Sequence, residues 1–136
     1  MCSSDLGQLA SPWGVALAPM SFGKFGGDLL VGNFAFGDSV INAFNPTTWA
    51  FEGSIDVNVG AGNTPGGLWS LAFGGGGNDG NPSTLFFTDG INGEKDGLFG
   101  SFTAVPEPST WAMMLAGFGG LALLAARRRR SLSAIG

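Results

Sequence analysis

Residues 11–19 read SPWGVALAP, and a related stretch, GGLWSLAFG, stands at residues 66–74. Two further segments recur in the same order, at residues 27–33 and 83–89 and at residues 38–44 and 96–102. Three residue pairs, with separations of 56, 56 and 57, mark the repeat: Trp13 and Trp69, Leu29 and Leu85, and Ile41 and Leu98. Self-similarity at such a period is typical of propeller blades and other repeat arrays.

Each repeat divides into short apolar runs separated by turn residues. The expected strands are residues 13–18, 29–33, 39–44 and 49–55 in the first repeat and 68–73, 84–88 and 98–102 in the second. The run at 29–31 is apolar throughout and predicts a strand buried on both faces, whereas 39–44 predicts a more exposed strand. Four short antiparallel strands per repeat are typical of a propeller blade. We therefore predict an all-β fold, a partial β-propeller with antiparallel blades over residues 7–102.

The segments PWGVAL, LLVGN and INAFNPTT of the first repeat resemble the blade pattern of NHL-type propellers. Over residues 9–102 the body also resembles the C-terminal blades of exported NHL-like propeller proteins, whose function is not established. A propeller has four to eight blades, and an exported protein carries a signal peptide, which this sequence lacks. We therefore expect the N-terminal part of the protein to be missing. MCSSDL, residues 1–6, resembles a translated sequencing adapter and is expected to be a non-native leader.

The C-terminal region carries a membrane signal. Residues 111–126, WAMMLAGFGGLALLAA, contain no polar side chain and predict a transmembrane helix of about 24 Å. Trp111 stands where an interfacial aromatic belongs, and the positive-inside rule places the basic tail, residues 127–136, in the cytoplasm. Four consecutive arginines set this topology: Arg127, Arg128, Arg129 and Arg130. The body is then expected on the periplasmic side of the inner membrane, with the lipid bilayer as a partner.

A linker, residues 103–110, precedes this helix and contains Val105, Pro106, Glu107 and Pro108. Alternate prolines keep the backbone extended, which is the form that a protease or transpeptidase binds. Motif, helix and arginine cluster together resemble the PEP-CTERM sorting signal of exported bacterial proteins over residues 105–130. The resemblance implies processing by an exosortase, a membrane transpeptidase, followed by a cell-surface or extracellular location. It also implies an exopolysaccharide-producing setting, so exopolysaccharide is a further candidate partner.

Composition excludes several kinds of chemistry. The sequence has no histidine and one cysteine, which excludes Ser-His and Cys-His catalysis, histidine metal sites and internal disulfides. Residues 1–105 hold nine acidic residues against two lysines, so we expect no binding to nucleic acid. We expect no cofactor and assign no catalytic residue.

Asn92, Glu94 and Asp96 carry oxygen ligands at alternate positions, as calcium loops do. The twelfth position is Thr103 instead of the glutamate that an EF-hand requires, so these residues are weak metal candidates and a hairpin turn is favoured. Trp13 and Trp69 recur at the same repeat position, which favours a role in the blade core. Trp49 is the better candidate for an exposed aromatic residue.

Three functions remain open. The favoured hypothesis is a non-enzymatic cell-surface or matrix propeller that is sorted through its C-terminal signal and has a binding or structural role. The first alternative is a propeller enzyme, hydrolase or lactonase-like, whose active site lies in missing blades. The second alternative is a permanently membrane-anchored protein whose tail is never removed.

Overall fold

A computed structural model describes residues 7–35 and 37–103. The chain divides into two compact units, Met1–Val105 and Pro106–Gly136, and the description falls within the first. Outside the described residues lie the expected leader, the transmembrane helix, the basic tail and every residue of the expected sorting motif: Val105, Pro106, Glu107, Pro108, Trp111, Arg127, Arg128, Arg129 and Arg130. Within residues 7–35 and 37–103, no helix is long and apolar enough to cross a membrane.

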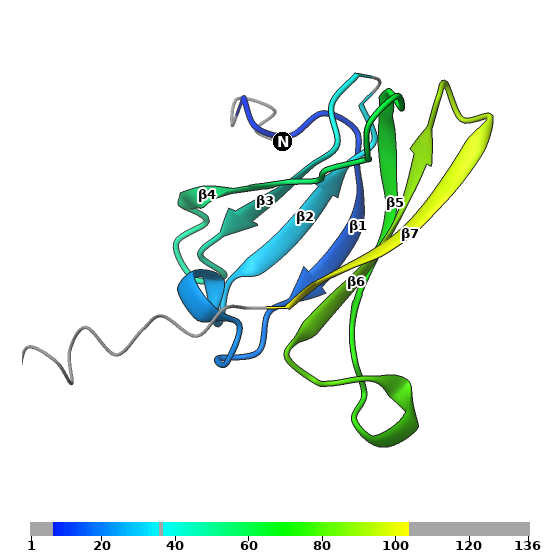
Figure 1. The fold of residues 1–136 in the computed structure, drawn as a ribbon. Coiled ribbons are helices and arrows are strands. Elements are labelled where there is room, and N and C mark those ends of the chain that lie inside the picture. Colours follow the sequence, from blue (N-terminus) through cyan, green and yellow to red (C-terminus); the bar gives the residue numbers. More distant parts are fainter. Residues whose placement is uncertain (1–6, 36, 104–136) are drawn as a thin grey trace, which may run out of the picture. The chain divides into compact units, whose positions relative to one another are not determined.

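Two antiparallel sheets form the described part (Figure 1). The first has the order β1-β2-β3-β4, with strands Pro12–Leu17, Leu29–Asn33, Val40–Phe44 and Phe51–Asp56. The second has the order β5-β6-β7, with strands Pro65–Phe73, Thr84–Ile91 and Asp96–Thr103. One short 3-10 helix lies in the first connection of each sheet: η2, Gly23–Phe25, between β1 and β2, and η3, Gly77–Asp79, between β5 and β6. The predicted all-β class and the antiparallel pairing are confirmed.

The structural register follows the sequence repeat through the first two strands of each sheet. Strands β1 and β5 each carry a register shift at their tryptophan, between Pro12 and Gly14 and between Leu68 and Ser70. In the third strand the correspondence differs from the expected one by a residue. Gly32 pairs with Ile41 and its counterpart Thr88 pairs with Phe99, so Ile41 corresponds to Phe99 and not to Leu98. The turns that join the second and third strands differ in length, which moves the register.

The two sheets pack face to face around one core. From the first sheet it includes Leu30, Ile41 and Ala43, and from the second Leu68, Leu71, Leu85, Phe87 and Ile91. Glycines permit the close approach of β5 to the first sheet. A Cβ built on Gly32 would lie 3.0 Å from Leu68 Cβ, and one built on Gly14 would lie 3.0 Å from the Leu71 backbone nitrogen. Figure 1 shows β1 and β5 side by side where the sheets meet.

The expectation that residues 39–44 form a more exposed strand is wrong. Ile41, Asn42, Ala43 and Phe44 are buried. Strand β3 lies between β2 and β4, so it has no free edge. One of its faces belongs to the core between the sheets, and on the other face Asn42 Nδ2 donates to the Gln8 carbonyl oxygen. Its one polar residue, Asn42, is buried and donates a hydrogen bond, which the sequence pattern alone did not distinguish from exposure.

The sheets stack in the same sense instead of mirroring each other. Val15 and Leu17 correspond to Leu71 and Phe73 in the repeat, yet Val15 is 54% and Leu17 63% exposed, whereas Leu71 is 7% exposed. Successive side chains of a strand point to opposite faces of the sheet, so the exposures of Val15, Leu17 and Leu71 show which face of each sheet is covered. The face that the second sheet buries against the first is the face that the first sheet leaves open.

Substitution of Gly32 tests the close approach of the sheets. We expect Gly32→Ala to lower the free energy of unfolding by about 1–3 kcal/mol, because the added methyl group would push Leu68 away. Gly97→Ala is the matched control, since a Cβ there meets no atom within 4 Å. Urea unfolding of both variants measures the difference, and equal stability would show that the sheets do not depend on this contact.

Candidate functional site

Three aromatic rings, those of Trp13, Phe34 and Trp69, form a cluster where β1 and β5 lie side by side. Trp13 and Trp69 meet edge to face with centroids 5.4 Å apart, and Phe34 lies 5.8 Å from Trp13 and 4.9 Å from Trp69. Trp13 is 60% exposed and Trp69 42% exposed, so the expected blade-core role of both residues is wrong. Each occupies the bulged position of its strand, and a bulge re-aims the side chain. Trp49 is 61% exposed, as expected.

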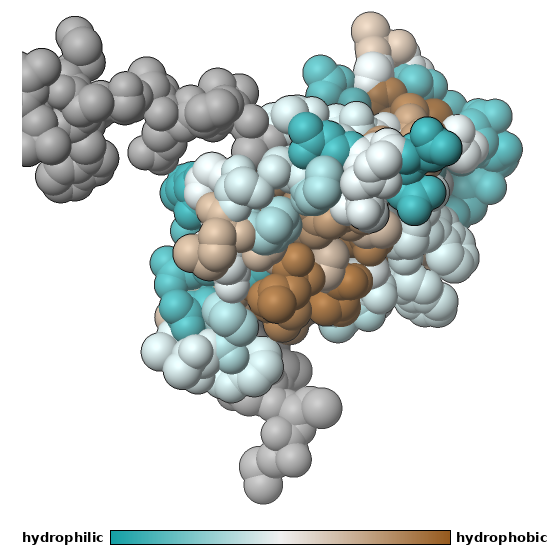
Figure 2. Space-filling model, turned by 90° about the horizontal axis from the view of Figure 1, so that it is seen from below, coloured by the Kyte–Doolittle hydropathy of each residue, from teal (hydrophilic) through white to brown (hydrophobic). Residues whose placement is uncertain are grey.

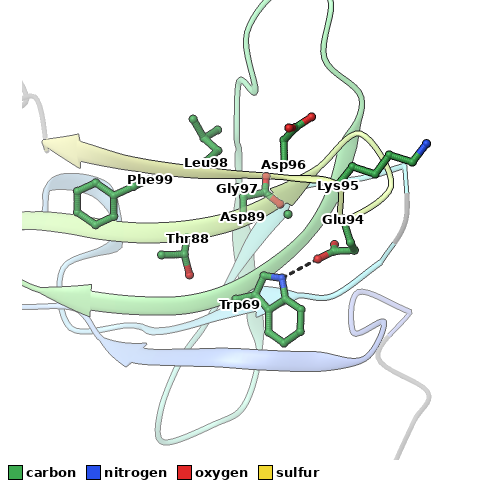
Figure 3. A pocket seen from close by; sticks show the side chains of 10 residues that line it. Trp69, Thr88, Asp89, Glu94, Lys95, Asp96, Gly97, Leu98 and Phe99 are labelled. Atoms are coloured by element: carbon green, nitrogen blue, oxygen red, sulfur yellow. Dashed lines mark hydrogen bonds between the residues drawn. The ribbon is translucent and has the colours of Figure 1, made fainter.

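Beside Trp69 lies an open cavity of about 500 Å³ (Figure 3). Its lining comes from β5, β6, β7 and the turn between β6 and β7, and combines an aromatic ring with acidic, basic and hydroxyl groups. The lining residues are Trp69, Thr88, Asp89, Gly90, Glu94, Lys95, Asp96, Gly97, Leu98 and Phe99. A volume of this order is usual for a ligand site in proteins.

Asp89 is the buried acidic residue of this cavity, with 2% of its surface exposed. Its Oδ1 accepts a hydrogen bond of 3.0 Å from the Gly67 backbone N–H, while its buried Oδ2 has no hydrogen-bond partner among the described residues. The corresponding residue of the first repeat is Asn33, whose Oδ1 accepts from the Ala10 N–H at 3.2 Å and whose Nδ2 donates to the Gln8 carbonyl at 2.7 Å. Both polar atoms of the Asn33 amide therefore form hydrogen bonds. Of the two Asp89 carboxylate oxygens, only Oδ1 forms one with the described residues.

Glu94 lies in the turn between β6 and β7, with a backbone φ of 63°. The Trp69 indole Nε1 donates to Glu94 Oε2 at 2.9 Å, shown as the dashed line in Figure 3. Glu94 Oε1 is buried, and no described residue donates to it. A Cβ on Gly90 would overlap this carboxylate, so only glycine leaves room for it. The turn thus places the Glu94 carboxylate in the lining of the cavity, where it accepts the hydrogen bond of the Trp69 indole N–H.

The weak metal candidates Asn92, Glu94 and Asp96 form hydrogen bonds in and beside the β6–β7 turn. Asn92 Nδ2 donates to Asp96 Oδ2 at 2.9 Å and to Asn63 Oδ1 at 3.0 Å, and Asn92 Oδ1 accepts from the Thr64 N–H at 3.0 Å. Glu94 turns instead toward Trp69. Over residues 7–35 and 37–103, no group of three or more metal-binding side chains is found. These contacts favour the hairpin interpretation.

Sequence reasoning grouped Asp89 with Asn92, Glu94 and Asp96 but did not take it as a site residue, and it did not single out Phe34. The repeat held a signal for Asp89, because the period of 56 places it over Asn33, and a buried position that alternates between Asn and Asp carries a side-chain acceptor in both repeats. Phe34 has no such signal. Its contact with both tryptophans depends on how the sheets pack.

The C-terminal region is identified by comparison with known families. Residues 104–130 match the PEP-CTERM protein-sorting motif. The match contains all the expected sorting and topology residues, and it supports export and sorting through an exosortase, a membrane enzyme. No curated protein and no solved structure matches the chain. The NHL-like resemblance of the body therefore has no support from a homologue or a solved structure.

Substitution of Asp89 distinguishes the contributions of its two carboxylate oxygens to stability. We expect Asp89→Ala to lower the free energy of unfolding by about 1–3 kcal/mol, because the Gly67 N–H would lose its acceptor. Asp89→Asn keeps an acceptor and copies the residue of the first repeat, so we expect it to be at least as stable as the original protein. Thermal unfolding measures both. Equal destabilisation by the two substitutions would contradict a structural role for one oxygen alone.

Proposed function

We propose that this chain is an exported cell-surface or matrix protein, sorted by its C-terminal PEP-CTERM motif and acting as a non-enzymatic binding or structural module. The observation that carries the proposal is the sorting motif at residues 104–130. The body first lies on the periplasmic side of the inner membrane, held by residues 111–126 with the arginines in the cytoplasm. An exosortase then removes the tail and releases the body to the surface or the extracellular matrix.

Intact mass in the native host tests the sorting step. We expect the segment beyond Pro106–Pro108 to be lost when the exosortase is present and retained when its gene is deleted. Substituting both Pro106 and Pro108 by alanine should block the loss, because the segment would no longer be held extended for the enzyme. The matched control is Pro82→Ala, in a loop of the folded body. An unchanged mass in both strains would identify a plain membrane anchor.

We propose further that the two sheets are blades of a β-propeller. Two observations support this: both sheets are antiparallel meanders with a bulged tryptophan in the first strand, and they stack in the same sense. Head-to-tail stacking is a heterologous arrangement, which closes into a ring when the rotation permits. The open face of the first sheet carries an apolar hollow lined by Leu9, Leu29, Val31, Phe44 and Trp49. In a propeller a further sheet of the same kind would cover this face.

Apolar residues that reach the surface are consistent with such covering. Figure 2 shows a hydrophobic area beside hydrophilic residues on one side of the described part. On the open face of the first sheet, Leu17 is 63% exposed, and on the opposite face of the second sheet Phe99 is 69% exposed and stacks on Phe86 with centroids 5.8 Å apart. Contiguous exposed apolar surface usually marks an interaction site.

Thiol labelling in the native host tests the blade arrangement. In a Cys2→Ser background, we expect Leu17→Cys to be protected from a maleimide reagent, because a neighbouring sheet covers it. Met20→Cys is the matched control, since Met20 is 82% exposed in the loop after β1 and should label rapidly. Labelling of both positions at the same rate would show that the face is open and that the sheets are not blades of a closed ring.

A further inference from the structure

The cavity beside Trp69 brings together two features that one ligand would satisfy. Two of its lining residues, Asp89 and Glu94, each have one buried carboxylate oxygen, Oδ2 and Oε1 respectively, that receives no hydrogen bond from the described residues. A buried polar atom without a partner is costly in a folded protein and calls for an explanation. Next to them stands an indole that is 42% exposed, held by its Nε1 and by edge contacts with Trp13 and Phe34. The oxygens require donors, and the indole offers an apolar surface.

We propose that this cavity binds a neutral glycan, with one sugar ring against the Trp69 indole and its hydroxyl groups donating to Asp89 and Glu94. The inference rests on the binding role proposed above and names its ligand class. A sugar ring has an apolar face that packs on an aromatic ring and a rim of hydroxyl groups that both donate and accept. The cavity matches this combination, because Lys95 and Thr88 stand in its lining with the two acids.

Other ligand classes fit the cavity less well. An anionic polysaccharide would meet an acidic body whose cavity adds three carboxylates and one lysine. A metal ion would need a set of ligands that the described residues do not assemble. An ammonium group only donates, so it would leave Lys95 and Thr88 without a role. A neutral glycan uses both kinds of group.

The ligand reaches Asp89 by displacing the Glu94 side chain. The Trp69–Glu94 hydrogen bond is exposed to solvent, and Glu94 lies in a turn at the end of the sheet. Exposed hydrogen bonds exchange readily with water or ligand, since their net contribution to stability is small. When Glu94 turns toward a bound sugar, the Trp69 Nε1–H becomes free to donate to a ring hydroxyl.

Calorimetry with the full chain, in a detergent that has no sugar head group, tests the inference. The probes are cellohexaose, laminarihexaose, maltohexaose and oligosaccharides from the neutral fraction of the native host's extracellular polysaccharide. We expect at least one to bind, and we expect Trp69→Ala to abolish the binding. Asp89→Asn and Glu94→Gln should each weaken it by about tenfold or more, because a charge-assisted hydrogen bond is lost.

Trp49→Ala is the matched control, because Trp49 is also an exposed tryptophan, at 61% against 42% for Trp69, but lines the apolar hollow on the open face of the first sheet. Binding that survives Trp49→Ala and fails in Trp69→Ala supports the site. Equal effects of the two substitutions, no binding of any neutral probe, binding of choline instead, or cleavage of the probe would each overturn it. Tail removal by the exosortase is measured separately by mass, so failure of glycan binding leaves the sorting function standing.

Discussion

In both sheets, a buried Asn or Asp side chain accepts a hydrogen bond from the backbone that precedes the bulged tryptophan, from Ala10 in the first sheet and from Gly67 in the second. The accepting residue, Asn33 or Asp89, lies at or near the end of the second strand. The Gly67 N–H is buried, and leaving it unpaired would cost more than the bond contributes when it is made. The bond therefore stabilises the backbone beside the bulge, and the bulged position turns Trp69 out of the core, as the bulge of β1 does for Trp13. The aromatic cluster and the cavity beside it follow from this constraint.

The difference between the two repeats concentrates chemistry in the second. Asn33 can donate as well as accept, and the residues around Gln8 use both capacities. Asp89 can only accept when it is ionised, and its second oxygen receives no donor from the described residues. A sequence that needed only the strand entry would be served by asparagine at both positions. A carboxylate at the second position favours an interaction with something outside the fold.

The sequence predicted those parts of the fold that depend on local pattern. The period of 56 located β1, β2, β5 and β6, because apolar alternation and turn residues repeat together. Exposure was predicted poorly. The tryptophans were expected in the core because recurrence and size favour burial, and no local pattern reveals a bulge. Residues 39–44 were expected to be more exposed, although Asn42 is buried and its amide donates to the Gln8 carbonyl oxygen. Both errors concern contacts with segments far along the chain.

The matched sorting motif begins directly after β7, the last strand of the described residues. Strand β7 ends at Thr103, and the match starts at residue 104. Among the described residues β7 has a partner on one side only, so it is the edge from which the sheet could extend. Proline has no N–H to give to a ladder and is confined to edges and strand ends. The sequence of the sorting motif, with Pro106 and Pro108, therefore disfavours a regular strand in the segment that we propose as the exosortase substrate.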